Sequence, residues 1–239
     1  MKNKQIEIIY EDNDVLVINK PSGIIVIPDQ HTPEEQTVAG MLKKQYGIKI
    51  WVIHRIDRDT TGVLIFAKNA AAHRSLSMQF EASEASKKYL ALLSGVVEDE
   101  NGTIDKPILI SGRDVSIDPS GKASRTDYKV LERFKGYTFV EASPLTGRRH
   151  QIRIHFWSIG HPLAVDADYG SSDPILLSSF KRKYKEKQGT EEKPLINRLT
   201  LHAAQLTIAL PGKSEKTVFT APLPKDFEIT LKQLRKYYL

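Results

Sequence analysis

Short runs of apolar residues, each bounded by turn-forming residues, recur along this chain of 239 residues. The run Val15 to Ile18 is soon followed by Lys20-Pro21-Ser22-Gly23, where proline lacks a backbone donor and glycine tolerates a positive φ. The runs at 63–67 and 89–93 have the same form. Runs of about four to eight apolar residues are typical of buried strands, whereas a membrane helix needs about 20. The runs therefore predict a protein built on buried strands, with no membrane-spanning segment.

Helical spacing predicts helices between and after these strands, over residues 37–46, 70–80, 149–159 and 226–238. Thr37 and Asn69 are suited to cap the first two, and Gly47 and Gly160 follow the ends of the first and third. Further strands, some paired in hairpins, are expected over residues 123–133, 137–142, 199–210 and 215–220. The sum is an α+β fold, a mixed and mostly antiparallel sheet flanked by helices, which we expect to form a single domain over 1–239.

Composition and charge exclude several classes of function. The count of Cys 0 rules out disulfides, thiolate zinc sites and cysteine nucleophiles. No glycine-rich nucleotide motif or plausible metal cluster occurs, so we expect no cofactor and no metal. The net charge of +6 fits a polyanionic partner such as RNA or DNA. The N-terminus carries no signal-like apolar stretch, which favours a cytoplasmic protein, and a monomer is our default expectation.

A basic run with one aromatic residue, at 181–187, stands out inside a polar stretch at about 171–194. It contains Lys181, Arg182 and Lys183, followed by Tyr184 and Lys185. Such a run is either a solvated surface insertion or an arm that contacts RNA, and both hypotheses stay open here.

The segment His54 to Lys68 places two carboxylates, Asp57 and Asp59, beside Arg55 and Arg58. The acidic and basic residues lie in a predicted loop between apolar segments, where catalytic groups often sit. Nearby cations favour an ionised carboxylate, which can then act as a nucleophile or a base. The alternative from charge pattern alone is a surface loop of ion pairs.

A second cluster of basic residues lies at Thr146 to His155, where Arg148 and Arg149 open the predicted third helix. Free N–H groups and cationic side chains at a helix start suit a phosphate or carboxylate. Helical spacing puts Arg149 and Arg153 on one face. His150 and His155 are five residues apart, so a metal pair is not expected.

These segments resemble the RluA-type family of pseudouridine synthases. His54 to Lys68 is similar to the family signature H-R-L-D-x-x-T-S-G-L-L-L-x-A-K, and Thr146 to His155 is similar to T-G-R-T-H-Q-I-R-x-H. Three further short family motifs, called boxes below like the first two, match in the same order at residues 87–95, 160–170 and 198–203. The resemblance spans about Glu11 to Pro222, and five boxes in one order are far more specific than any single box.

The resemblance implies an isomerase that converts uridine to pseudouridine in structured RNA, either large-subunit ribosomal RNA or transfer RNA, on the pseudouridine synthase catalytic-domain fold. It implies that Asp57 is the catalytic aspartate, that Tyr89 stacks on the target base and that Arg153 pairs with the aspartate. Arg55 corresponds to an arginine that fills the gap left by the flipped nucleotide. Further residues expected to bind RNA are His54, Arg148, Arg149, His150, Ile152, Lys181, Arg182 and Lys183.

Two other functions fit parts of the sequence. A glycoside hydrolase would use Asp57 and Asp59 as a carboxylate pair, but this leaves the other four boxes unexplained. A catalytically silent RNA-binding or ribosome-assembly module would not need Asp57, which is present. Because the resemblance begins almost at Met1, we expect no S4-like RNA-binding domain ahead of it, so that the surface of the catalytic domain selects the RNA.

Overall fold

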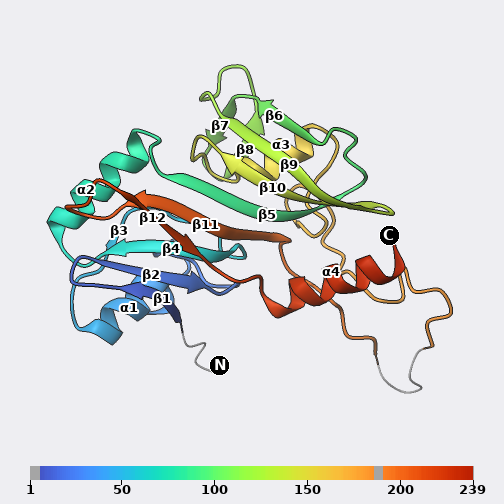
Figure 1. Ribbon diagram of the computed structural model, residues 1–239, viewed down its shortest axis with the longest axis horizontal. Coiled ribbons are helices and arrows are strands. Elements are labelled where there is room, and N and C mark those ends of the chain that lie inside the picture. Colours follow the sequence, from blue (N-terminus) through green and yellow to red (C-terminus); the bar gives the residue numbers. More distant parts are fainter. Residues whose placement is uncertain (1–5, 186–190, 239) are drawn as a thin grey trace. The chain divides into compact units, whose positions relative to one another are not determined.

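The computed structural model describes residues 6–185 and 191–238 (Figure 1). The described chain divides into two compact units. Unit 1 comprises residues 6–89 and 202–222, and unit 2 comprises residues 90–185, 191–201 and 223–238.

Unit 1 is a sheet with one helix on each face. Its strands lie in the order β1-β2-β4-β11, with β3 paired to β4 and β12 paired to β11. The elements are β1 (Glu7–Glu11), β2 (Val15–Lys20), the 3-10 turn Glu34–Gln36, α1 (Val38–Tyr46), β3 (Trp51–Val52), β4 (Thr61–Ala67), α2 (Ala70–Glu81), β11 (Leu201–Ala209) and β12 (Lys216–Thr220). The pair β4–β11 is parallel, and the pairs β1–β2, β2–β4, β3–β4 and β11–β12 are antiparallel.

Strands β2 and β4 are buried on both faces because alternate side chains meet different helices. Val17 and Ile65 belong to the same apolar cluster as Leu76 of α2. Leu16 and Phe66 belong to the cluster that contains Leu42 of α1. Side chains of a strand alternate between faces, so an unbroken apolar run is what a two-sided core requires.

Both predicted caps of these helices are confirmed. The Thr37 side chain accepts a hydrogen bond from the N–H of Gly40 at 3.1 Å, and Asn69 accepts one from Ala72 at 2.9 Å. Gly47 takes a left-handed conformation, with φ of 66°, and ends α1. Side-chain caps satisfy backbone donors that the first turn of a helix leaves open, so short sequence signals fix these boundaries well.

Unit 2 contains a sheet of order β5-β10-β9-β6 and a separate two-stranded hairpin, β7–β8. Its elements are β5 (Ser86–Ser94), which begins in unit 1, β6 (Asn101–Asp105), β7 (Ile108–Ser111), β8 (Asp114–Ile117), β9 (Arg125–Phe134), β10 (Tyr137–Pro144), α3 (Gln151–Ser158) and α4 (Lys225–Tyr237). The strands expected over 123–133 and 137–142 form a hairpin, in which Lys135-Gly136 joins β9 to β10 and Phe134 lies opposite Tyr137. The strands β6, β7 and β8 were not predicted, because they are short and largely exposed and therefore carry little hydrophobic pattern.

An apolar cluster of unit 2 joins α4 to the sheet. Phe227, Leu231 and Leu234 of α4 are buried and pack with Leu92 and Phe139. The same cluster includes apolar residues of the connection between α3 and β11, namely Ala164, Val165, Ile175, Phe180 and Ile196. This connection is therefore part of the core, although its sequence is largely polar.

The predicted α+β class, a mixed and mostly antiparallel sheet with helices, is confirmed. The prediction that Arg149 and Arg153 share a helix face is wrong, because α3 begins at Gln151 and His150 has a φ of 54°. That left-handed residue turns the chain just before the helix, so Arg149 lies outside it. Among the described residues, no helix is both long enough and apolar enough to cross a membrane.

Candidate active site

The loop that carries Asp57 runs from the end of β3 at Val52 to the start of β4 at Thr61. Arg55, Arg58 and Asp59 are exposed, Ile56 is buried and Asp57 is half-buried. Ile56 therefore anchors the middle of the loop, while the charged side chains on either side reach solvent. A loop between two strands of one sheet has fixed ends, which limits how far Asp57 moves.

Lys20, at the end of β2, holds this loop from the inside. Its side chain is fully buried, and its Nζ donates to the carbonyl oxygens of Arg58 at 2.7 Å and Thr60 at 3.0 Å. It also donates to the carbonyl of Pro21 at 3.0 Å, and the N–H of Gly23 donates to the same Arg58 carbonyl at 3.0 Å. A buried ammonium needs hydrogen-bond acceptors, and these carbonyls supply them. The Lys20–Gly23 turn, which the sequence indicated only as a strand stop, is therefore the support of the Asp57 loop.

The far end of the loop is fixed by a close approach of two strands. Gly62 has a φ of 114°, and a Cβ there would come within 2.1 Å of the carbonyl oxygen of Ala203. Next to it, the Thr61 hydroxyl lies 2.8 Å from Nδ1 of His202, while Nε2 of His202 lies 3.1 Å from the carbonyl of Ala221. The carbonyl can only accept, so in the neutral ring Nε2 carries the proton and the Thr61 hydroxyl donates to Nδ1. The boxes that contain Gly62 and His202 thus meet in the parallel pair β4–β11.

His54 is held at the start of the loop as a neutral ring. Its Nε2 accepts the N–H of Ile65 at 3.3 Å, and its ring stacks on Phe80 with 4.5 Å between centroids. Burial, together with the positive charge of Lys87, lowers the pKa of His54 to about 3. His54 is therefore an uncharged acceptor at neutral pH, which suits a structural contact in unit 1.

Tyr89, in β5, lies close enough to Asp57 for the two groups to interact electrostatically. Burial, with the negative charge of Asp57 as a second cause, raises the pKa of Tyr89 well above its usual value. The phenol consequently stays protonated at neutral pH. It can offer a ring face and an O–H donor, but it cannot act as a base.

Replacing Lys20 by methionine is expected to lower the free energy of unfolding by about 3 kcal/mol, because three carbonyl oxygens lose the hydrogen bond from the buried ammonium and only that of Arg58 keeps another donor. Chemical denaturation of the wild type and the variant measures this loss. The matched control is Lys44→Met, which changes an exposed lysine of α1 and should shift stability little. Equal unfolding free energies for the two variants would contradict the supporting role of Lys20.

The lowered pKa of His54 predicts a specific pH dependence of stability. The unfolded chain takes up a proton on His54 near its ordinary pKa of 6.5, whereas the folded chain does so only near 3. Stability is therefore complete above 6.5 and falls as the pH drops toward 3. The slope is at most about 1.4 kcal/mol per pH unit. His54→Phe keeps a ring against Phe80 and should lose this part of the slope, as measured by denaturation at about pH 7 and about pH 4. A slope unchanged in His54→Phe would show that another group is responsible.

In unit 2, the start of α3 is organised by Gln151. Its side-chain oxygen accepts from the Thr146 hydroxyl at 2.7 Å and from the N–H of Arg148 at 3.0 Å. Its amide nitrogen donates to the carbonyl of Arg125 at 2.9 Å and the hydroxyl of Thr126 at 3.0 Å. The buried amide thereby fills all four of its hydrogen-bonding positions and fixes the turn that carries the arginines.

Arg153 is buried in α3 and holds two carboxylates. Its Nε and Nη2 donate to the two oxygens of Asp166 at 2.8 and 2.6 Å, and Nη2 also donates to Asp168 at 2.6 Å. The guanidinium lies over the ring of Tyr169, 5.1 Å from its centroid. A bidentate pair of this kind fixes the plane of the guanidinium. Asp57 belongs to unit 1, so the predicted pairing of Arg153 with Asp57 stays a prediction.

Asp166 and Tyr169 surround Arg153 in the structure, although the sequence assigned neither of them a role. One oxygen of Asp166 also accepts the N–H groups of Asp168 at 3.0 Å and Tyr169 at 3.3 Å. The Tyr169 hydroxyl lies 3.0 Å from Nδ1 of His150, and burial raises its pKa to about 12. Both residues lie in the family motif at 160–170, where an aspartate and a tyrosine follow Gly160-His161-Pro162, and this motif is the sequence signal that could have identified them.

The remaining predicted site residues lie in unit 2. Arg149 donates to the carbonyl of Gly112, at the tip of the β7–β8 hairpin, at 3.2 Å. Ile152 is buried, and Nε of Arg148 is buried without a hydrogen-bond partner among the described residues. Lys181 is half-buried, whereas Arg182 and Lys183 are exposed. Contact of these residues with RNA stays a prediction.

The chain is similar to known proteins along most of its length. Residues 14–158 match the family described as RNA pseudouridylate synthase. An uncharacterized RNA pseudouridine synthase of Bacillus subtilis is 36% identical, over 97% of this chain and 73% of its own length. The ribosomal large subunit pseudouridine synthase C of Buchnera aphidicola is 36% identical, over 95% of this chain and 70% of its own. The solved structure of human RNA pseudouridylate synthase domain containing 4 matches with a TM-score of 0.71 and 26% identity, over 96% of this chain and 93% of that one.

The second human protein, RNA pseudouridylate synthase domain containing 1, matches with a TM-score of 0.70 and 28% identity, over 92% of this chain and 84% of that one. The matched family region includes the Asp57 loop, β5 with Tyr89 and helix α3 with Arg153. The chain therefore belongs to the RNA pseudouridylate synthases, in the RluA-type family, which are isomerases that convert uridine to pseudouridine in RNA.

Proposed function

We propose that this protein converts specific uridines of large-subunit ribosomal RNA to pseudouridine, with Asp57 as the catalytic carboxylate. The target RNA follows from relatives: the proteins of Buchnera aphidicola, Nitrosomonas europaea and Vibrio cholerae are each named as ribosomal large subunit pseudouridine synthases. Each is between 34% and 36% identical to this chain over at least 95% of it.

The observation that carries the catalytic assignment is the construction of the Asp57 loop. A buried lysine, a glycine in close strand contact and a buried isoleucine hold the loop, and Asp57 lies near the phenol of Tyr89. A catalytic group has to be held in one geometry, and a solvated ion-pair loop needs no such support. The support favours a catalytic role for Asp57 over the surface-loop alternative.

The reaction breaks the N1–C1′ bond of uridine, turns the uracil and joins it again through C5. A carboxylate either adds to C1′ or removes the proton from C2′, and both routes need Asp57 ionised. No electrons or groups are exchanged with another molecule. The chemistry therefore requires no redox or group-transfer cofactor, and we propose that none takes part.

The target base has to leave its stack before Asp57 reaches the sugar, which costs a few kcal/mol or so. We propose that the ring of Tyr89 stacks on the extruded base and that Arg55, which is exposed beside Asp57, fills the space it leaves. A protonated phenol is suited to this because it adds no negative charge next to Asp57. Loops and bulges of RNA are the expected targets, since their bases are already partly unstacked.

The test is site-resolved mapping of pseudouridine in ribosomal and transfer RNA from cells with and without this gene. Loss of pseudouridine at one large-subunit position, restored by the wild-type gene, is the expected result. Loss only in transfer RNA would overturn the proposed target and keep the activity. If no position in either RNA changes, the proposed function is wrong, and a catalytically silent RNA-binding module becomes the better hypothesis.

A further inference from the structure

The second half of α4 carries basic side chains on its exposed side. Residues 230–238 include Lys232, Arg235 and Lys236 and no acidic residue. Lys232 and Lys236 are exposed and, four residues apart, lie on the same face of the helix. Arg235 is engaged with Glu132 of β9, to which it donates at 2.7 and 2.6 Å. The pairing offsets the negative charge of Glu132, so the local surface stays positive.

The basic run at 181–185 is anchored to the end of this helix. The ring of Phe180 is buried, with centroids 6.3 Å from Tyr237 and 5.1 Å from Tyr238. The Tyr238 hydroxyl donates to the carbonyl of Ser179 at 3.2 Å. Nζ of Lys181 lies 5.9 Å from the centroid of Tyr237. The run is therefore joined to α4 by packing and does not form an independent loop.

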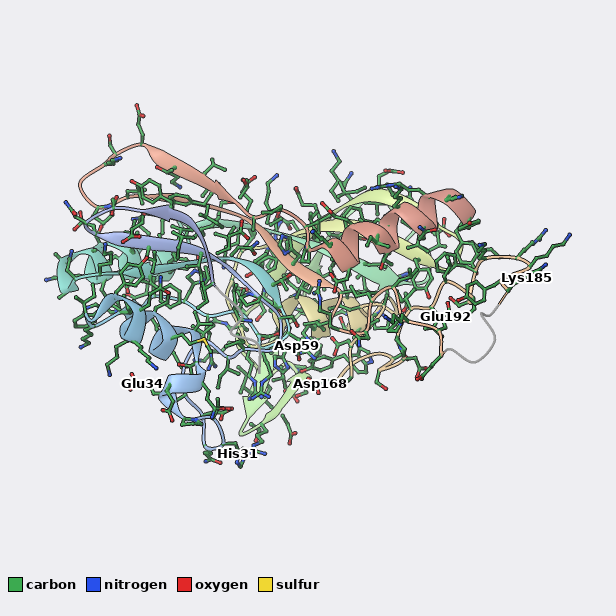
Figure 2. The ribbon with its side chains drawn as sticks, turned by 90° about the horizontal axis from the view of Figure 1, so that it is seen from below. His31, Glu34, Asp59, Asp168, Lys185 and Glu192 are labelled. Atoms are coloured by element: carbon green, nitrogen blue, oxygen red, sulfur yellow. The ribbon has the colours of Figure 1, made fainter. Side chains whose placement is uncertain are left out.

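The turn between β9 and β10 also contacts the C-terminal end of α4. The N–H of Lys135 donates to the carbonyl of Tyr238 at 3.1 Å, and the Lys135 side chain is exposed. Figure 1 shows the C-terminal end of α4 beside this hairpin. Figure 2 shows Lys185 at the outer end of its segment. Glu192 is engaged by the N–H of Ser178 at 2.9 Å.

Three segments that are distant in the sequence thus bring their cations together in unit 2. We call this the C-terminal basic surface, formed by Lys135, Lys181, Arg182, Lys183, Lys185, Lys232 and Lys236. Three tyrosines are interleaved with them: Tyr184, Tyr237 and Tyr238. Clustered cations with aromatic rings match the phosphates and bases of RNA.

Local helix electrostatics do not account for this surface. Cations in the last turn of a helix stabilise the negative end of its dipole, which explains Lys236. The same effect does not explain the exposed lysine of the β9–β10 turn, or the four cations at 181–185. A merely solvated surface would not need Phe180 buried beneath the run.

We propose that the C-terminal basic surface binds the phosphate backbone of the substrate RNA, outside the target nucleotide. This inference rests on the proposed function for its partner, since a ribosomal RNA substrate is a folded polyanion. Each lysine or arginine that neutralises a phosphate releases counterions, so the surface adds affinity that depends on salt and hardly on sequence. It would hold the RNA while the Asp57 loop acts on one uridine.

The first experiment replaces the two lysines on the exposed face of α4. The variant is Lys232→Gln with Lys236→Gln, which removes two charges and keeps good helix formers. The control is Lys44→Gln with Lys213→Gln, two exposed lysines of unit 1. The probe is a transcript of bacterial large-subunit ribosomal RNA, and its dissociation constant is measured over a range of salt concentrations.

The α4 variant should bind about tenfold more weakly at low salt, and its plot of log affinity against log salt should lose about 1.4 to 1.8 in slope. Arg182→Gln with Lys185→Gln should reduce the affinity and the slope by similar amounts. The variant that combines both pairs should show a reduction in slope equal to the sum of the two. The control should keep the wild-type slope. An unchanged slope in both pairs, or an equal loss in the control, would overturn the proposal.

Turnover of the same transcript separates this inference from the proposed function. The α4 variant should raise KM and leave kcat unchanged, because it contacts RNA away from the reacting uridine. Turnover by the wild type with an unchanged salt slope in the variants would overturn the basic surface alone. A reduced slope without pseudouridine formation by the wild type would overturn the proposed function and support the surface as an RNA contact.

Discussion

Asp57→Asn is expected to abolish isomerisation while leaving the fold and RNA binding intact. The amide has nearly the shape of the carboxylate, but it can neither attack C1′ nor accept the C2′ proton. Turnover should fall by about four orders of magnitude or more, the scale at which loss of a nucleophile or base affects other enzymes. The measurement is conversion of uridine to pseudouridine in purified large-subunit ribosomal RNA, with RNA affinity determined in parallel.

Asp59→Asn is the matched control, because it makes the same change two residues away in the same loop. Asp59 is exposed, and among the described residues its carboxylate accepts a weak hydrogen bond from the Ser22 hydroxyl at 3.4 Å. Turnover by Asp59→Asn should stay within about threefold of the wild type, as expected for an exposed side chain away from the chemistry. A carboxylate-pair mechanism, as in glycoside hydrolases, would instead need both aspartates. Equal losses in the two variants, or turnover by Asp57→Asn at the wild-type rate, would remove Asp57 from its assigned role.

Gly62→Ala is expected to have the largest effect on stability, about 4 kcal/mol. The residue has a φ of 114°, a conformation that is strained for any side chain. The added Cβ would also lie 2.1 Å from the carbonyl oxygen of Ala203, so the backbones of β4 and β11 would have to separate. The free energy of unfolding, from chemical denaturation, measures the combined cost.

The control for this prediction is Gly47→Ala. Gly47 also has a positive φ, of 66°, but a Cβ there would meet no atom within 4 Å. Gly47→Ala should therefore lower the free energy of unfolding by only about 1 kcal/mol, the cost of a positive φ for alanine. Similar decreases in the free energy of unfolding for the two variants would contradict the prediction, because they would mean that β4 and β11 separate at little cost. A Gly62→Ala variant that does not fold, beside a folded Gly47→Ala, would support the prediction.

The local features of the fold followed from the sequence because they depend on residues close together in the chain. The predicted helix ends are correct: Thr37 and Asn69 cap the starts of α1 and α2, and Gly47 ends α1. Such caps act over three or four residues, so a local sequence signal is enough. The apolar runs of β2 and β4 were buried on both faces, as unbroken runs predict. The exception is the start of α3, where the buried side chain of Gln151 and the left-handed His150 delay the helix until residue 151.

The sequence by itself determined the family, the candidate catalytic aspartate and the class of the fold, because ordered motifs and hydrophobic patterns are written along the chain. Only the tertiary structure decided what supports Asp57 and what holds Arg153. Lys20 meets Arg58 and Thr60 across 38 and 40 residues, and Arg153 meets Asp166 across 13. Likewise, the C-terminal basic surface joins three segments whose charges look unrelated in the sequence. The choice of a partner for a buried charge depends on which backbones fold together, and no local pattern encodes that.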